Sequence, residues 1–255
     1  MGAKKNYSAN FMRSYFNFGK LIFIILSTLT LNINAASPGT FDKAKKIAYQ
    51  IFEQHPVTIY CGCQYHGHQI DLGNCGMQAA ETIKRAHRLE WEHMMPAENF
   101  GRQLTCWYEK VCTKENGQKY KGRKCCDNTS QQFKIMESEL YNLWPAVGLV
   151  NQARSNYRFS EVGNINLPTS NFYGCHVIID KKLRKIEPRD EAKGIVARAN
   201  LFMSEKYSIK LSQSQRLLFE AWSKKYPPAQ WEIQWAAKIA SIEGYTNPFV
   251  QWPNL

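Results

Sequence analysis

The chain has 255 residues, of which 44% are hydrophobic and 21% are charged, and its formal net charge is +12 at pH 7. This composition is typical of a folded globular protein and excludes a disordered chain. The excess of positive charge indicates an acidic partner such as nucleic acid, anionic lipid or acidic polysaccharide, and charge alone does not choose among them.

The first 35 residues have the pattern of a signal peptide. Basic residues precede an uncharged apolar run over residues 21–31, and Ala35 offers a small residue for cleavage. The run is too short for a comfortable membrane span, which disfavours the alternative of an uncleaved anchor. Removing this leader lowers the net charge from +12 to about +8, because it holds four basic residues and no acidic one. We expect an exported protein, periplasmic or extracellular, with its mature domain over residues 36–255.

The mature chain is predicted to begin with a helix over residues 39–54, which His55-Pro56 ends. Residues 57–60 (VTIY) favour a short strand, and glycines then indicate turns around Cys75. The apolar residues at helical spacing and the turn residues are Ala44, Ile47, Ala48, Ile51, Phe52, Gly73, Asn74 and Gly76.

Eight cysteines follow the leader, an even number that predicts up to four disulfides in an exported chain. Zinc is the alternative, since Cys61 and Cys63 lie close to His66 and His68, but this spacing fits no standard zinc pattern. Roughly a hundred connectivities are open to eight cysteines, so the pairing is not determined. The cysteines are Cys61, Cys63, Cys75, Cys106, Cys112, Cys125, Cys126 and Cys175.

Residues 88–93 are expected to form a strand with Leu89, Trp91 and His93 on one face and Glu90 and Glu92 on the other. A carboxylate beside an imidazole offers an oxygen ligand for Mg²⁺ and a proton acceptor near neutral pH. Hydrolysis of a phosphodiester needs both. Alone, however, a Glu-His pair is more often a solvated surface pair.

The rest of the chain predicts more helix than strand. Residues 105–130 are polar, rich in lysine and hold four cysteines, so we expect a disulfide-stapled loop. With no internal repeat or linker, one helix-rich α+β domain is the simplest prediction. The predicted helices span residues 131–143, 187–207, 212–226 and 230–243, the third ended by Pro227-Pro228.

Several motifs occur in a fixed order along the mature chain. They are EWEH at 90–93, PA at 96–97, FG at 100–101, CW at 106–107, MES at 136–138, NLWP at 142–145, VG at 147–148, VN at 150–151, A-x-G-x-x-A-R at 192–198, F-x-x-W-x-x-x-Y-P at 219–227 and NPFV at 247–250. Together they resemble the bacterial endonuclease I family of periplasmic and extracellular nucleases, over residues 40–252. This resemblance implies a ββα-metal finger as the active site.

The resemblance also implies roles for individual residues. His93 corresponds to the general base that activates water, and Glu92 and Asn151 correspond to the ligands of one divalent metal. We expect Mg²⁺, with Ca²⁺ or Mn²⁺ as alternatives. An asparagine ligand adds an oxygen without a second full charge, which leaves the ion electropositive toward phosphate.

Three further residues match polar positions of the family. Glu137 and Asn142 are expected to line the site, although Glu137 alone would be read as part of a helix surface pair. Arg123 matches an arginine that holds the cleaved phosphate, for which its planar fork is suited. Arg154 is either a phosphate contact or a solvated helix residue, and the second is favoured.

The chain departs from the family pattern in its cysteines. Relatives often carry a pair near the carboxyl terminus, whereas residues 229–252 have none. An extra pair, Cys112 with Cys125 or Cys126, lies in or beside a lysine-rich insertion between Cys112 and Lys121. We expect a local bridge to close this insertion, which then adds a basic rim to the substrate cleft.

The remaining histidines and tryptophans have more ordinary interpretations. No motif supports a role for His66, His68 or His176, and we expect them at the surface. Tryptophans are more often core residues than platforms for bases, and we expect this of Trp144, Trp222 and Trp231.

The function predicted is an exported endonuclease that hydrolyses DNA and RNA without sequence specificity and leaves 5′-phosphate ends. Such an enzyme contacts backbone phosphates, which carry no sequence information. We expect a monomer without stable membrane association after removal of the leader. The alternatives are a noncatalytic secreted binder of nucleic acid or acidic polymer, and a disulfide-stapled structural protein. The joint presence of Glu92, His93 and Asn151 disfavours both.

Overall fold

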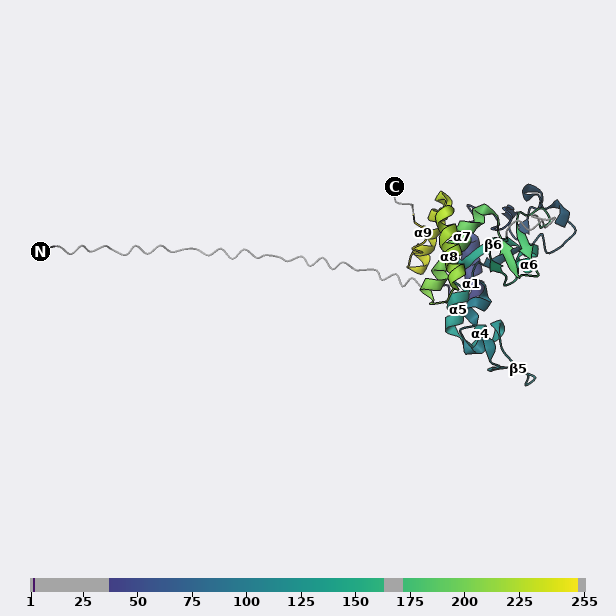
Figure 1. The fold of residues 1–255 in the computed structure, drawn as a ribbon. Coiled ribbons are helices and arrows are strands. Elements are labelled where there is room, and N and C mark those ends of the chain that lie inside the picture. Colours follow the sequence, from purple (N-terminus) through teal and green to yellow (C-terminus); the bar gives the residue numbers. More distant parts are fainter. Residues whose placement is uncertain (1, 3–36, 163–171, 252–255) are drawn as a thin grey trace. The chain divides into compact units, whose positions relative to one another are not determined.

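The computed structural model describes residues 37–162 and 172–251, together with Gly2 (Figure 1). The expected signal peptide and its cleavage site, apart from Gly2, lie outside the described residues. From Ser37 onward the described residues belong to one compact unit of mixed helix and sheet. Among the helices of these residues, none is long and apolar enough to cross a membrane.

Helix α1 (Phe41–Phe52) confirms the prediction for residues 39–54. The side chain of Thr40 caps its amino terminus by accepting a hydrogen bond from the backbone N–H of Lys43. One face of the helix, which includes Ala44, Ala48 and Phe52, is buried in the core. The opposite face is polar because it is exposed to solvent, as is usual for an amphipathic helix at the surface of a domain.

The strand expected at residues 57–60 is wrong. Val57 forms only an isolated bridge with Gln64, and the backbone turns back through Gly62, which has a φ of 71°. The Gly62 N–H bonds to the oxygen of Thr58 and the Thr58 N–H bonds to the oxygen of Cys63, so this segment forms a turn instead of a strand. A small antiparallel pair follows instead, and then two 3-10 helices. These elements are β1 (Tyr65–His66), β2 (Gln69–Ile70), η1 (Gly73–Cys75) and η2 (Gln78–Ala80).

Strand β3 (Leu89–His93) confirms the prediction for residues 88–93. It pairs antiparallel with β6 (Leu143–Val147), with Trp91 opposite Pro145. Helix α6 (Gly148–Arg154) follows β6 without a loop and contacts both strands. One small unit of two strands and one helix is therefore formed by two segments that are far apart in the sequence, residues 88–93 and 143–154.

The segment expected as a stapled loop contains regular structure. Two short helices enclose a small hairpin, and the helix expected over residues 131–143 ends at Glu137, because the chain continues into a 3-10 turn and then β6. Figure 1 shows β5 beyond α4 and away from the helices α7 and α8. The elements from Ala97 to Asn142 are α2 (Ala97–Gly101), α3 (Thr105–Tyr108), β4 (Cys112–Thr113), β5 (Lys119–Tyr120), α4 (Arg123–Thr129), α5 (Gln131–Glu137) and η3 (Leu140–Asn142).

All eight cysteines are paired, which confirms disulfides over zinc. Cys112 bonds to Cys125, so the insertion is closed by a local bridge as expected. The other three bridges join Cys61 to Cys175, Cys63 to Cys75 and Cys106 to Cys126.

The carboxyl-terminal part confirms the three predicted helices as α7 (Asp190–Lys206), α8 (Gln213–Lys225) and α9 (Gln230–Glu243). Helix α7 packs along α8 and is buried on nearly all sides. Trp144 and Trp222 are core residues as expected, whereas Trp231 is only partly buried and stacks on His55. A three-stranded sheet in the order β7-β9-β8 precedes these helices, formed by β7 (Arg158–Phe159), β8 (Ile178–Asp180) and β9 (Lys185–Glu187).

Candidate active site

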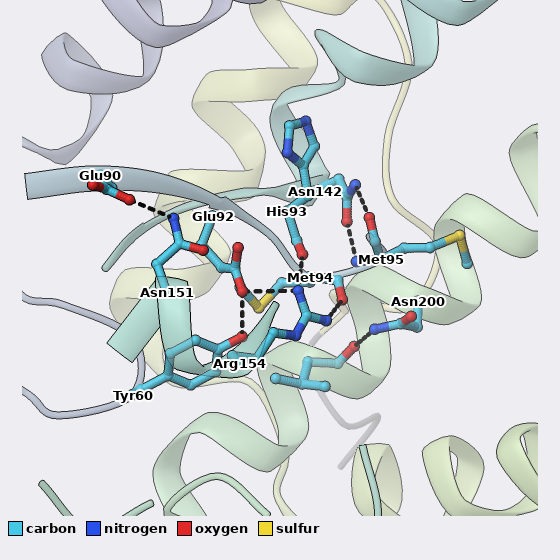
Figure 2. A network of polar contacts seen from close by, with 11 residues as sticks. Tyr60, Glu90, Glu92, His93, Met94, Met95, Asn142, Asn151, Arg154 and Asn200 are labelled. Carbon is cyan, nitrogen blue, oxygen red and sulfur yellow. Dashed lines mark hydrogen bonds and ion pairs between the residues drawn. The ribbon is translucent and has the colours of Figure 1, made fainter. Parts of the chain in front are cut away.

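A cleft of about 1320 Å³ runs along the outer edge of β3. Strand β3 pairs with β6 on one side, and within the described residues its other edge has only a bridge from Arg88 to Gln69. Successive side chains of a strand point to opposite faces, and Figure 2 shows the ring of His93 and the carboxylate of Glu92 on opposite sides of the strand. Because this edge is open, residues from both faces border the cleft. The structure thus brings four predicted site residues to one cleft: Glu92, His93, Arg123 and Asn151.

The ring of His93 is held in one orientation and is 5% exposed. It packs against Phe41 and Phe100, with ring centroids 5.0 and 6.1 Å away. Its Nε2 lies 2.8 Å from the backbone oxygen of Glu137. A carbonyl oxygen can only accept, so Nε2 carries the proton and Nδ1 remains free to accept one. Burial, aided by the positive charge of Arg123, lowers the pKa of His93 to about 3. The imidazole is therefore neutral at pH 7 and has a lone pair on Nδ1.

The carboxylate of Glu92 is oriented by two donors. Its Oε1 accepts hydrogen bonds from the Tyr60 hydroxyl at 3.0 Å and from Arg154 Nη1 at 2.8 Å. Burial raises the pKa of Glu92, and the charge of Arg154 opposes this shift. The other oxygen, Oε2, takes part in no hydrogen bond within the described residues. It is the oxygen left to meet a ligand.

Arg154 is not a solvated helix residue, so the favoured expectation for it is wrong. Its side chain is 1% exposed. Besides the bond to Glu92, its guanidinium donates to the backbone oxygens of His93 and Met94, each at 2.8 Å (Figure 2). Arg154 thus fastens the end of β3 to α6 and balances the buried charge of Glu92.

The amide of Asn151 is oriented by Glu90. Its Nδ2 donates to Glu90 Oε2 at 3.1 Å, and Glu90 in turn accepts two hydrogen bonds of 2.9 Å from Arg85. An ionised carboxylate can only accept, so the amide nitrogen must face Glu90. Figure 2 shows the Asn151 oxygen on the side toward Glu92. Gly148 gives Glu90 its room, since a Cβ there would lie 2.9 Å from Glu90 Oε1.

These oxygens fit a divalent cation that keeps most of its water. The described residues contain no cluster of three or more His, Cys, Asp or Glu side chains suited to a metal. Glu92 Oε2 and Asn151 Oδ1 nevertheless face the same cleft, and neither has a hydrogen-bond partner in the described part of the chain. One carboxylate and one amide oxygen are hard donors, and Mg²⁺ commonly binds through one or two carboxylates, water and substrate phosphate.

Arg123, which lines the cleft, forms an ion pair with Glu137, with Nε and Oε1 2.5 Å apart. The side chain of Glu137 is not among those that line the cleft. Glu137 is buried, so its interpretation as a helix surface pair is wrong, and burial raises its pKa against the effect of Arg123. The guanidinium of Arg123 is about half exposed and lies over the ring of Phe41. Its Nη nitrogens have no partner within the described residues, which leaves the fork free for a phosphate.

Asn142 does not line the cleft. Its side chain is completely buried, where Oδ1 accepts from the backbone N–H of Met95 at 2.7 Å and Nδ2 donates to the backbone oxygen of Met95 at 3.0 Å. The expectation that it borders the site is wrong because the turn after His93 uses both ends of the amide. Asn142 supports the backbone that follows the imidazole.

The sequence does not reveal the partners that orient the site. Tyr60 and Arg85 lie in turns and belong to no motif. For Glu90, the signal in the sequence is its place on the same face of the strand as Glu92. The histidines expected at the surface, His66, His68 and His176, are exposed, although His68 also borders the cleft.

Comparison with known proteins adds an independent finding. The family model described as Endonuclease I matches residues 24–254. The chain is 39% identical over 237 residues to an extracellular deoxyribonuclease of Aeromonas hydrophila, covering 91% of this chain and 96% of that protein. A periplasmic deoxyribonuclease of the same organism is 38% identical over 225 residues, covering 86% and 88%. Endonuclease-1 of Buchnera aphidicola subsp. Acyrthosiphon pisum (strain APS) is 34% identical over 245 residues, covering 94% and 92%.

Proposed function

The chain belongs to the endonuclease I family and is an exported nuclease, and we propose that it hydrolyses DNA with one divalent metal ion and without sequence specificity. Relatives named extracellular and periplasmic deoxyribonucleases support DNA as the substrate. The polar groups of the cleft are suited to phosphate rather than to base edges, so we extend the proposal to RNA. The protein acts as a monomer in the periplasm or outside the cell.

In this proposal β3, β6 and α6 form a ββα-metal finger. Glu92 Oε2 and Asn151 Oδ1 would hold the ion, preferably Mg²⁺. When bound, such an ion stabilises the negative charge that builds on the phosphate and on the leaving oxygen. Tyr60 and Arg154 keep Glu92 in place, and Glu90 binds the amide nitrogen of Asn151, so that the amide oxygen would be available to the ion.

The acid–base chemistry falls to His93. Its Nδ1 takes a proton from a water molecule as that water attacks phosphorus. The bond from phosphorus to the 3′ oxygen breaks, and the 3′ oxygen leaves as a hydroxyl after it takes a proton from a second water molecule. The cleaved phosphate therefore stays on the 5′ oxygen of the next nucleotide. The Nη nitrogens of Arg123 donate to this phosphate. A positioned imidazole base contributes a factor of roughly 10² to 10⁴ to the rate.

The observation that carries the proposal is the state of His93: a neutral ring, with Nε2 bonded to a backbone oxygen, in the same cleft as Glu92 and Asn151. A noncatalytic binder does not need a proton acceptor held beside a carboxylate and an amide.

The proposal is tested by nicking of supercoiled plasmid with Mg²⁺, with and without EDTA. We expect EDTA to abolish nicking and His93→Ala to lower its rate at least about a hundredfold. The matched control is His176→Ala, which removes an exposed histidine that does not line the cleft. Equal nicking by His93→Ala, or nicking that EDTA leaves unchanged, contradicts the proposal. Binding of plasmid without nicking by the unmodified protein favours the noncatalytic alternative.

A further inference from the structure

Residues 110–124, called the basic hairpin below, carry six basic residues and one acidic residue, Glu115. They comprise β4, the tip at residues 114–118, β5 and the first residues of α4. Glu109 and Asp127 flank the segment. Its five lysines are exposed, and none forms an ion pair within the described part of the chain. The basic residues are Lys110, Lys114, Lys119, Lys121, Arg123 and Lys124.

The basic hairpin is fixed to the edge of the cleft. Trp107, just before it, and Arg123, near its end, both line the cleft. The two ends are joined by the bond from the Gly122 N–H to the Cys106 oxygen at 2.9 Å, and the disulfide Cys112–Cys125 closes the segment. These two links therefore fix the lysines of the hairpin in position relative to Arg123 and the cleft.

The lysines keep their charge available to an outside partner. Lys114 and Lys119 contact only neutral oxygens, those of Gln118 and Thr113, each at 2.8 Å. No acidic side chain among the described residues pairs with these lysines. A phosphate can therefore bind them without first breaking an ion pair within the protein. Unpaired lysines bind phosphates as point charges and without preference for a base.

Two large apolar side chains lie at the base of the hairpin. Tyr108 is 52% and Val111 is 50% exposed, and in the sequence both follow the cleft residue Trp107 and precede the tip of the hairpin. The tip, residues 114–118, contains no apolar side chain. A loop that inserts into a membrane needs apolar residues at its tip, so this distribution disfavours a lipid surface. Tyr108 and Val111 instead offer apolar contact for the sugars of a nucleic acid strand, and the lysines offer positive charge for the phosphates of the same strand.

We propose that the basic hairpin binds the phosphate backbone of a DNA duplex beyond the nucleotides held in the cleft. This inference rests on the proposed function for its substrate. Arg123 holds the phosphate at the cleaved bond, and the lysines extend that contact along the same DNA. The hairpin thus makes the enzyme favour long DNA over short oligonucleotides.

The test compares two variants that lose equal charge. One is Lys114→Gln/Lys119→Gln/Lys124→Gln in the hairpin. The control is Lys210→Gln/Lys224→Gln/Lys238→Gln, whose lysines are exposed and lie outside the cleft. Binding to a labelled duplex several helical turns long is measured by fluorescence anisotropy in EDTA, so that no cleavage is needed. Thermal melting checks that both variants fold.

We expect the hairpin variant to bind the long duplex at least about tenfold more weakly and to reduce the salt slope of log Kd by roughly 2 to 3, whereas the control changes affinity by about twofold or less. Metal-supported cleavage of a short oligonucleotide stays unchanged in both. Equal loss in the two variants, or no loss in the hairpin variant, overturns the inference. Loss of binding to phosphatidylglycerol vesicles with unchanged duplex affinity also overturns it. Failure of the proposed function is distinct, because it appears as absent or EDTA-resistant nicking by the unmodified protein.

Discussion

Asn151 donates a hydrogen bond of 3.1 Å from Nδ2 to Glu90, a residue 61 positions earlier in the chain. This bond sets which end of the amide faces the cleft. Since a carboxylate cannot donate, Asn151 has to present its oxygen on the side of Glu92. The orientation of one proposed metal ligand is therefore imposed by a residue that lies outside the ligand set.

The first prediction concerns this orientation. In Glu90→Gln, the new amide can donate as well as accept, and it no longer pairs with the charge of Arg85. The amide of Asn151 is then free to turn its nitrogen to the ion. We expect the Mg²⁺ concentration for half-maximal nicking to rise about 10- to 100-fold, as is usual when a residue that orients a ligand is changed.

The matched control for this variant is Glu81→Gln, which removes an exposed carboxylate outside the cleft. Mg²⁺ titration of plasmid nicking, supported by calorimetric titration of the ion alone, provides the measurement. The same Mg²⁺ requirement for Glu90→Gln and the unmodified enzyme would show that Asn151 keeps its orientation without Glu90.

The second prediction concerns the buried pair of Arg154 and Glu92. Arg154→Met leaves the Glu92 carboxylate buried and without its cation, so we expect a loss of about 3–5 kcal/mol in the free energy of unfolding. Arg158→Met removes an exposed arginine four residues away and should change stability by less than about 0.5 kcal/mol. Urea unfolding followed by tryptophan fluorescence measures both. Similar midpoints for the two variants would refute the structural role of Arg154.

The third prediction concerns a carboxyl pair in the core, Glu139 and Glu243. Glu139 accepts hydrogen bonds from the hydroxyls of Tyr207 and Tyr245 at 2.6 and 2.8 Å, and Glu243 accepts one from the backbone N–H of Leu140 at 3.2 Å. Burial, together with the charge of Glu139, raises the pKa of Glu243 to about 10. Glu243 thus stays protonated in the folded protein at neutral pH.

The sign of the pH effect follows from this raised pKa. Below the ordinary pKa of 4.5, Glu243 is protonated in both states and has no effect. Between 4.5 and about 10, only the unfolded chain releases the proton, so stability falls by up to about 1.4 kcal/mol per pH unit. Glu243→Gln cannot titrate. Its Tm relative to the unmodified protein should therefore rise steadily with pH, whereas Glu205→Gln, an exposed control, should show no such trend. A difference for Glu243→Gln that is constant with pH would contradict the raised pKa of Glu243.

The fourth prediction compares two disulfides. Cys61–Cys175 spans 114 residues of sequence and Cys112–Cys125 spans 13. In the chain-entropy account, the longer loop restricts the unfolded chain more, by roughly 1–2 kcal/mol. Replacing Cys61 and Cys175 by serine should accordingly lower the urea midpoint more than the same change at Cys112 and Cys125. A larger loss from the short loop would point to strain or unfolded-state structure as the dominant effect.

Much of the secondary structure could be predicted because it depends on neighbours in the sequence. The helix at residues 39–54 and the three carboxyl-terminal helices follow from apolar residues at helical spacing and from the prolines that end two of them. The strand carrying Glu92 and His93 follows from alternation. The prediction of a strand at residues 57–60 was wrong, because Thr58 and Gly62 bond within a turn and only Ile59 hydrogen-bonds to a strand, β6.

The sequence by itself determined the helical segments, the even set of cysteines, and the ordered motifs that carry the family and its chemistry. Tertiary structure alone decided the pairing of the cysteines, the burial of Arg154 and Asn142, and the partner of each site residue. The physical reason is distance along the chain. Tyr60, Glu92 and Arg154 act on one another only after folding brings β3 against α6, and no local pattern records a hydrogen bond between residues 62 positions apart.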